Sequence, residues 1–380
     1  MIVFLEEYNS GDYEQQAGYK AFIPSKINKQ WVWKSTKVNI LLEKATLELG
    51  GLNSYSELIT DIDVYIQMHI NVEANKSSKI EGTKTTIEED LSPIQDLDPE
   101  KQKDAQEVQN YLVALQYGVD QINSGKLPMS SRLMREIHKR LMQSVRGEHK
   151  TPGEYRTSQN WIGGSMPSLA MYVPPPHLQI PDLIADLERF IHNEDINIPQ
   201  LIRIAMIHYQ FESIHPFLDG NGRTGRILIP LLLLHSKMLY KPCFYISDYF
   251  ETHRTEYYDA LNRVRLQNDM VSWIMFFLEA SIVTAQSAKM KFKNALKFVN
   301  KTNLIASKIS GTIGNVQSIL NAFYKKPVQT PSDLAQSLSI STQTVNRILD
   351  SLSEHKIIQE GTGNVRNRIY IMKKYLDIFR

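Results

Sequence analysis

Cysteine is nearly absent from this chain: Cys243 is the only one among 380 residues, so no intrachain disulfide can form, which fits a reducing compartment. Long hydrophobic runs are missing too, because the longest strongly apolar stretch, residues 227–234, is far too short to span a bilayer. The N-terminus lacks the basic start of a signal peptide and turns acidic at Glu6. We therefore expect a cytoplasmic protein with no membrane partner.

An excess of either charge is also lacking, and the net charge of +2 says little about partners. What is present is the composition of an ordinary soluble globular protein, with 42% hydrophobic and 22% charged residues. A length of 380 residues predicts two or three domains.

The most informative stretch is the run HPFLDGNGRTGR, which extends from His215 to Arg226. Its glycines let the backbone turn sharply, and a helix that begins near Asn221 would point unpaired N–H groups at an anion. Arg223 and Arg226 share a helix face and can fork onto phosphate oxygens. Asp219 can hold a divalent cation that bridges phosphates, and His215 can act as a general base. The run therefore predicts nucleotide chemistry.

The same run contains a competing pattern, because Gly220, Gly222 and Gly225 satisfy the G-x-G-x-x-G fingerprint of dinucleotide-binding folds. That fingerprint must follow a strand, whereas residues 201–214 carry apolar side chains at the spacings of three and four that a helix produces. The sequence also lacks further β–α–β units from which to build a parallel sheet. We therefore do not expect a Rossmann fold.

At every specified position the run matches the pattern H-P-F-x-[D/E]-G-N-G-R-x-x-R, and in this stretch the chain resembles the Fic family. The resemblance implies a protein adenylyltransferase (AMPylator), which transfers AMP from ATP to a Ser, Thr or Tyr hydroxyl of a target protein. It implies that His215 deprotonates this hydroxyl and that Asp219 binds Mg2+. The nucleotide phosphates would be held by Gly220, Asn221, Gly222, Arg223 and, at the γ-phosphate, Arg226. Relatives that transfer phosphate have lysine in place of Gly222, so glycine here favours AMP.

Upstream, residues 77–82 resemble the inhibitory motif [S/T]-x-x-x-E-[G/N] that many Fic proteins carry before their catalytic core. Ser77 and Glu81 lie one helical turn apart and share a face, and Gly82 can end the helix. The resemblance implies that Glu81 pairs with Arg226 in the place of the γ-phosphate and inhibits the enzyme. In some relatives the equivalent glutamate instead positions a water that removes AMP from the target. The simpler interpretation is a capped helix end with an ordinary polar face.

Residues 160–176, rich in glycine and proline, lie where the family has its flap, a hairpin that docks the target protein by strand addition. Tyr155 and Arg156 are candidates to order the base of this hairpin. A structural hairpin without contacts to a target is the alternative.

Downstream, Tyr258 and Asn262 match the family's adenine-side helix, where a ring can stack on the base and an amide can bond its edge. Core packing is the alternative for both. His208 lies two helical turns before His215, and we expect a buried, hydrogen-bonded histidine there rather than a metal ligand.

The last stretch, residues 311–380, resembles a winged-helix DNA-binding domain in its order of helix, helix-turn-helix and hairpin. It holds nine basic and five acidic residues, a balance that suits phosphate contact. The start of the expected recognition helix is polar around Arg347, and Arg366 and Arg368 lie on the expected wing. DNA is the predicted partner, with protein docking as the alternative.

The predicted fold class is mainly α: a Fic-type helical bundle with a small β-hairpin flap, plus the C-terminal winged-helix domain. The predicted units are an N-terminal region with the inhibitory helix at 1–100, a catalytic core at 101–288, a basic linker or helix at 289–310 and the winged helix at 311–380. Helices are expected at 38–49, 61–80, 101–123, 130–145, 181–191, 200–213, 223–238, 253–266, from 271 onward, 315–325, 333–338 and 342–355.

Three functions fit these features. The first is an autoinhibited adenylyltransferase that uses ATP and Mg2+; the second is an enzyme that removes AMP with the help of Glu81. The third is a DNA-binding regulator that senses ATP without turnover. The intact His215 and Asp219 favour an enzyme, because a sensor needs no base. Self-modification and a homodimer are further options.

Overall fold

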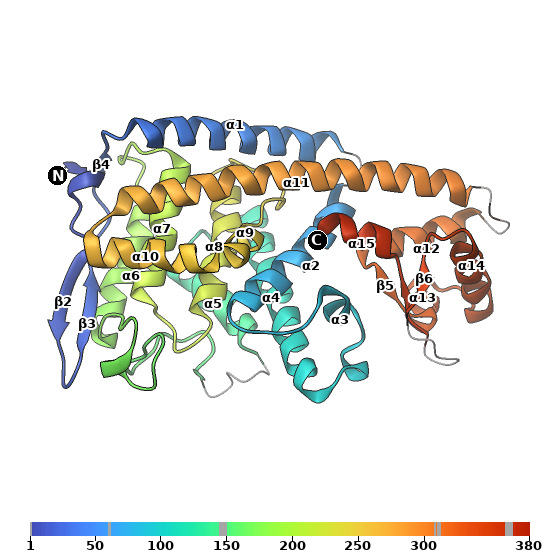
Figure 1. Ribbon diagram of the computed structural model, residues 1–380, viewed down its shortest axis with the longest axis horizontal. Helices are drawn as coiled ribbons and strands as arrows, with labels where there is room; N and C mark the ends of the chain where they lie inside the picture. Colours follow the sequence, from blue (N-terminus) through green and yellow to red (C-terminus); the bar gives the residue numbers. More distant parts are fainter. Residues whose placement is uncertain (1, 60–61, 144–149, 308, 310–312, 362–367) are drawn as a thin grey trace.

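The computed structural model describes residues 2–59, 62–143, 150–307, 309, 313–361 and 368–380. Helices dominate this part of the chain, and Figure 1 shows them as an elongated bundle with a smaller helical unit at one end. The helices of the larger unit are α1 (Thr36–Leu58), α2 (Ile62–Ile80), α3 (Ile87–Leu91), α4 (Pro99–Ser124), α5 (Ser131–Leu141), α6 (Ile180–His192), α7 (Gln200–Ile214), α8 (Asn221–His235), α9 (Ser247–Thr252), α10 (Arg254–Gln267) and α11 (Met270–Ala306). Those of the smaller unit are α12 (Ile313–Lys325), α13 (Pro331–Leu338), α14 (Thr342–Glu354) and α15 (Lys373–Phe379).

Helix α1 extends further than the sequence predicted. The side chain of Ser35 caps its start by accepting the N–H of Val38, and the helix continues through Gly50 and Gly51 to Leu58. Two glycines lower helix stability by roughly 1 kcal/mol each. Packing along α11 offsets this penalty, since the two helices run side by side in Figure 1 and contact each other extensively. The prediction that this helix ends at residue 49, just before the two glycines, was therefore wrong. Tertiary contacts outweigh local helix propensity here.

Helix α11 is the long spine of the molecule and includes the lysine-rich residues 289–306. By length and composition it could cross a membrane, although the apolar run of residues 227–234 had suggested that no segment could. Half of its most apolar window is buried inside the fold, where Trp273, Phe277 and Phe292 belong to the hydrophobic core. We therefore assign α11 as a core helix.

The N-terminal residues form strands that the sequence analysis did not predict. β1 (Ile2–Phe4) pairs in parallel with β4 (Gln30–Val32), and β2 (Gly11–Gln15) pairs antiparallel with β3 (Lys20–Pro24). The hairpin projects from the end of the bundle opposite the smaller unit (Figure 1). The N–H of Phe22 donates to the carbonyl of Val173 at 2.9 Å, so β3 lies directly beside the expected flap.

The smaller unit has the helix order expected of a winged helix. Thr330 and Ser341 cap α13 and α14, each accepting a backbone N–H three residues on. The three strands β5 (Val328–Gln329), β6 (Gln359–Glu360) and β7 (Tyr370–Ile371) form an antiparallel sheet in the order β5–β7–β6. Arg366, which the sequence predicts on the wing, lies outside the described residues.

This unit packs directly on helix α2, which carries the expected inhibitory motif. Contacts join α2 to both α12 and α15, and α15 also packs against α11. The ring of Phe379 lies 6.4 Å from that of His69, centroid to centroid, and Arg380 pairs with Glu88. The winged-helix unit and helix α2 are therefore neighbours.

We predict that Asp186→Ala lowers the free energy of unfolding by about 1–3 kcal/mol, measured by urea denaturation. Asp186 is buried, and its carboxylate accepts the N–H groups of Ile27 at 2.7 Å and Asn28 at 3.3 Å, which tie the N-terminal segment to α6. Asp182 on the same helix is the control, since its ion pair with Lys26 is exposed to solvent and Asp182→Ala should cost less than about 1 kcal/mol. Equal losses of unfolding free energy in Asp186→Ala and Asp182→Ala would contradict the stabilising role given to the Asp186 carboxylate.

Candidate active site

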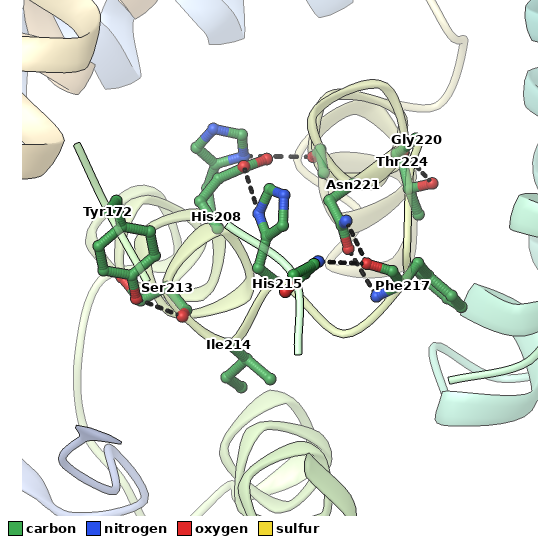
Figure 2. Close-up of polar contacts among 12 residues, drawn as sticks. Tyr172, His208, Ser213, Ile214, His215, Phe217, Gly220, Asn221 and Thr224 are labelled. Carbon is green, nitrogen blue, oxygen red and sulfur yellow. Dashed lines mark hydrogen bonds and ion pairs between the residues drawn. The ribbon is translucent and has the colours of Figure 1, made fainter. Parts of the chain in front are cut away.

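His215 ends helix α7 in a left-handed conformation, with φ of 48° and ψ of 61°. Its N–H donates to the carbonyl of Phe211 at 2.9 Å, which closes the last turn. Such a conformation is uncommon for a residue other than glycine and persists when the surroundings hold it in place. The turn aims the imidazole between the end of α7 and the start of α8, as Figure 2 shows.

The loop between these helices is closed by the side chain of Asn221. Its Oδ1 accepts the N–H of Phe217 and its Nδ2 donates to the carbonyl of the same residue, both at 2.8 Å (Figure 2). Gly220 has φ of +74°, and a Cβ there would lie 2.7 Å from the sulfur of Met142. Since the Asn221 side chain shapes the loop, a nucleotide contact from this residue would come from its backbone N–H.

Arg156 joins this loop to the flap. Its Nε donates to the carbonyl of His215 at 3.0 Å, and its Nη2 donates to that of Pro175 at 2.5 Å. The backbone N–H of Arg156 donates to the carbonyl of Pro216 at 2.9 Å. The hydroxyl of Tyr155 lies 2.8 Å from that of Ser131 at the start of α5, so of the two residues predicted at the hairpin base only Arg156 is shown to contact the flap.

The flap itself is a short hairpin with a bridge between Ile162 and Tyr172. Gly163 and Gly164 both have positive φ, and a Cβ at Gly164 would lie 2.4 Å from the carbonyl oxygen of Leu169. Only glycine therefore fits that position without backbone movement. Exposed apolar side chains gather on this segment, namely Trp161, Met166, Leu169 and Met171.

Arg226 is fully buried and is held by the two residues of the expected inhibitory motif. Its Nε donates to the hydroxyl of Ser77 at 2.8 Å, and its Nη2 donates to the Ser77 carbonyl at 2.9 Å and to Oε1 of Glu81 at 2.6 Å. Desolvation opposes ionisation of Glu81, but the charge and hydrogen bond of Arg226 hold the pKa of this carboxyl below its ordinary value. A Cβ at Gly222 would lie 2.3 Å from Oε1 of Glu81, so the carboxylate covers the first turn of α8.

Arg223 has a partner that the sequence analysis missed. Its Nη1 donates to Oε2 of Glu107 at 2.8 Å, and both side chains are nearly buried. Glu107 lies on α4, far from the motif in sequence, and no local pattern marks it. The first N–H groups of α8 have no carbonyl partner within the helix, as at any helix N-terminus, so they and Arg223 can serve an anion together.

The electrostatics around His215 suit a base. Burial is the largest cause that lowers the pKa of its imidazole, to about 3, and the nearby Arg156 and Arg265 lower it further. At neutral pH the ring is therefore uncharged and one nitrogen has a free lone pair.

Asp219 is exposed at the start of the loop turn, where its Oδ1 accepts the N–H of Gly220 at 2.6 Å. No cluster of three or more His, Cys, Asp or Glu side chains suited to a metal occurs among the residues that the structure describes. A single carboxylate nevertheless fits Mg2+, which proteins commonly bind through one or two carboxylates plus substrate phosphates.

The remaining candidates lie on or beside α10. Tyr258 is partly buried, and burial raises the pKa of its hydroxyl; the charge of Glu81 raises it further and that of Arg226 lowers it, so the residue borders the same site. Oδ1 of Asn262 accepts a hydrogen bond from Arg265 at 3.2 Å.

His208 is confirmed as a buried, hydrogen-bonded histidine. Its Nδ1 lies 3.2 Å from the carbonyl oxygen of Gly225 (Figure 2), and its Nε2 lies 2.9 Å from the hydroxyl of Tyr257. Both ring nitrogens are thus occupied within the fold.

Known protein families match three parts of the chain. The Fic/DOC family matches residues 128–233, the Fic/DOC family N-terminal region matches residues 40–120, and winged helix-turn-helix DNA-binding matches residues 315–359. A protein adenylyltransferase Fic from Culex quinquefasciatus is 31% identical over 147 residues, which cover 38% of this chain and 26% of the relative. That from Aedes aegypti is 27% identical over 208 residues, or 54% and 37% of the two chains. The chain thus matches only about a third of the length of these relatives.

Solved structures share the fold. A Fic family protein from Desulfovibrio desulfuricans G20 aligns with a TM-score of 0.55 at 22% identity, covering 89% of this chain and 96% of the other. Fic-1 (aa134–508) from C. elegans aligns with a TM-score of 0.54 at 19% identity, covering 68% and 74%. The chain therefore carries a Fic/DOC domain that contains the His215 loop, with the Fic/DOC N-terminal region before it and a winged helix-turn-helix domain after it.

Proposed function

We propose that this chain is a cytoplasmic protein adenylyltransferase that transfers AMP from ATP to a Ser, Thr or Tyr hydroxyl of a target protein, with Glu81 inhibiting the transfer. The observation that carries the proposal is the position of the His215 imidazole beside the N-terminal end of α8, where burial lowers its pKa. A base next to an anion-binding helix end suits attack of a hydroxyl on a phosphate. The adenylyltransferase relatives support the same chemistry.

In the proposed reaction, the target hydroxyl oxygen bonds to the α-phosphorus of ATP while its proton moves to His215. The bond between the α-phosphorus and the departing pyrophosphate breaks. The N–H groups at the start of α8, with Arg223 and Arg226, hold the phosphates in line for this attack. Mg2+ held by Asp219 would neutralise charge on the phosphates.

Inhibition follows from competition for Arg226. Its buried guanidinium already donates to Ser77 and Glu81, and the Glu81 carboxylate lies over the first turn of α8. A γ-phosphate bound by the same guanidinium would have to displace this carboxylate or lie elsewhere. The α-phosphate would then be turned away from the attacking hydroxyl.

A second candidate is AMP removal, favoured by the same position of Glu81. A carboxylate that covers Gly222 at the start of α8 can also orient a water toward a phosphate bound there. The two candidates make opposite demands on Glu81, since removal needs the carboxylate and addition is opposed by it.

We further propose that the winged-helix domain binds duplex DNA through α14. Gln343, Asn346 and Arg347 are exposed on this helix, beside the buried Val345 and Ile348 that hold it in the domain. Polar and cationic side chains near the start of a recognition helix are those that reach base edges and phosphates.

Glu81→Gly should raise AMP transfer above wild type by roughly tenfold or more, since about 1.4 kcal/mol of relieved competition already gives a factor of ten. The measurement is label transferred to the proteins of a cell lysate from ATP labelled on the α-phosphate. Glu100→Gly, which removes an exposed glutamate from the first turn of α4, is the control and should match wild type. Equal rates in wild type and Glu81→Gly would refute inhibition. Faster loss of AMP from labelled target in wild type than in Glu81→Gly would favour AMP removal.

His215→Ala should lower transfer by about 10²–10⁴-fold, the usual contribution of a positioned base, without weakening ATP binding measured by calorimetry. His177→Ala is the control and should retain full transfer. His177 begins a short helical turn that ends at Gln179, directly before α6. Label that arrives from the γ-phosphate instead would mean phosphoryl transfer. ATP binding with no transfer by any variant, Glu81→Gly included, would favour the ATP-sensing regulator.

Arg347→Ala should weaken binding to duplex DNA and reduce the slope of log affinity against log salt by about one, the effect of losing one phosphate contact. Fluorescence anisotropy of a labelled duplex at several salt concentrations measures both quantities. Arg380→Ala is the control, because Arg380 pairs with Glu88 and Asp377 away from α14. Failure of the unaltered protein to bind DNA would assign the domain to protein docking.

A further inference from the structure

Glu212 places a carboxyl group beside His215 that the reaction described above does not use. It lies on α7 one turn before His215, and its side chain is only 8% exposed. Its Oε2 lies 4.0 Å from Nδ1 of His215. Within the described residues, Oε1 of Glu212, which faces Gly225, has no hydrogen-bond partner, and Nδ1 of His215 has no side-chain partner at hydrogen-bond distance. The backbone of Glu212 also acts on the His215 ring and raises its pKa. Buried polar atoms without partners are rare and unfavourable, so a carboxyl group with one such oxygen beside His215 requires an explanation.

Gly225 provides the space that this carboxyl occupies. A Cβ at position 225 would lie 2.3 Å from Oε1 of Glu212 and 3.1 Å from Cδ1 of Phe211. Position 225 is one that the motif pattern leaves open, so the pattern itself does not demand glycine there. The close approach of α8 to Glu212 gives a physical reason for this glycine.

We propose that Glu212 is a positioning residue for His215: it favours the imidazole with its proton on Nδ1 and stabilises the imidazolium that forms during transfer. This inference rests on the adenylyl transfer proposed above. With Nδ1 protonated, the lone pair of Nε2 is free to take the proton of the target hydroxyl as its oxygen bonds to phosphorus and pyrophosphate departs. The positive charge that then appears on the ring faces the Glu212 carboxylate across a nearly buried gap, where an ion pair is stronger than in water.

The charged groups around Glu212 make its pKa depend on Glu81, the residue proposed to inhibit the enzyme. Burial is the largest influence and raises the pKa of Glu212 to about 7, while Arg226 lowers it and Glu81 raises it. Arg265 on α10 also lowers it, and the buried Tyr257 faces it from the same helix. Because the carboxylate predominates above the pKa, the proposed support for His215 is lost as the pH falls through this value. Removing Glu81 removes a like charge and shifts the loss to lower pH.

The kinetic test uses the full chain in the Glu81→Gly background, with ATP labelled on the α-phosphate and cell lysate as the source of target. Glu212→Gln should lower the maximal rate by about 10–100-fold with little change in the KM for ATP, because a base loses its charged support. In this variant the transfer rate should also no longer decrease as the pH falls through the pKa of Glu212, because glutamine does not titrate. Glu212→Asp should restore part of the rate and the acidic fall.

Two further variants separate positioning from stability. Gly225→Ala keeps the glutamate but displaces its carboxyl, so it should reproduce the rate defect of Glu212→Gln without weakening the helix. Asp186→Asn changes another buried carboxyl to an amide on α6, away from His215, and should leave the pH profile unchanged. A Glu212→Gln variant with an unchanged rate and pH profile would overturn the inference and leave adenylyl transfer intact.

A measurement without turnover keeps the two proposals apart. In protein labelled with nitrogen-15 in histidine, the ring signals of His215, assigned by their loss in His215→Ala, should move as Glu212 ionises near pH 7. The step should vanish in Glu212→Gln and move to lower pH in Glu81→Gly. If the pH dependence of the His215 ring signals is the same with glutamate and with glutamine at position 212, the inference is overturned. Absence of AMP transfer in Glu81→Gly would instead overturn the proposed function, with the ring signals still deciding the role of Glu212.

Discussion

A single buried guanidinium governs the arrangement of the site. Arg226 is inaccessible to water, and a charged group in that position must keep oxygen partners or become very unfavourable. In this structure Ser77 and Glu81 supply them, so the end of α2 is drawn onto the start of α8. Any state in which α2 moves away must provide Arg226 with another anion. A nucleotide polyphosphate is the natural replacement, which links substrate binding to the position of the helix.

The charges of the site form one coupled set rather than separate pairs. Glu81 stabilises Arg226 and disfavours ionisation of Glu212, while Arg265 lowers the pKa of both Glu212 and His215. Loss of one charge therefore alters the protonation of the others. Loss of Glu81 would therefore free Arg226 and would also lower the pKa of Glu212.

The sequence predicted the parts of the site that are written in consecutive residues. The motif placed His215 at the end of one helix and Arg226 inside the next, and the resemblance to the inhibitory motif implied that Glu81 pairs with Arg226. The contact of Ser77 with Arg226 was not predicted, although Ser77 was expected on the same helix face. It did not anticipate that the side chain of Asn221 would close its own loop, because that depends on how the turn folds. Glu107 and Glu212 were missed for a different reason: a lone glutamate on a helix carries no signal until the partner from another helix is known. The N-terminal strands were missed because their segments are short, and because β1 and β4 pair with each other across the β2–β3 hairpin that separates them in sequence.

Because α11 is one unbroken helix, its length fixes the rotation of its last residue relative to its first. The helix begins directly after α10, against which it packs, and continues to residue 306, just before the winged-helix unit that packs back onto α2 (Figure 1). Each residue of an α-helix turns the chain by about 100°, with about 3.6 residues per turn. One residue added to its distal half would turn the end of the helix, from which the chain continues toward α12, by more than a quarter of a revolution. The length of α11, counted in helical turns, thus sets the direction from which the chain approaches the winged-helix unit that packs on α2.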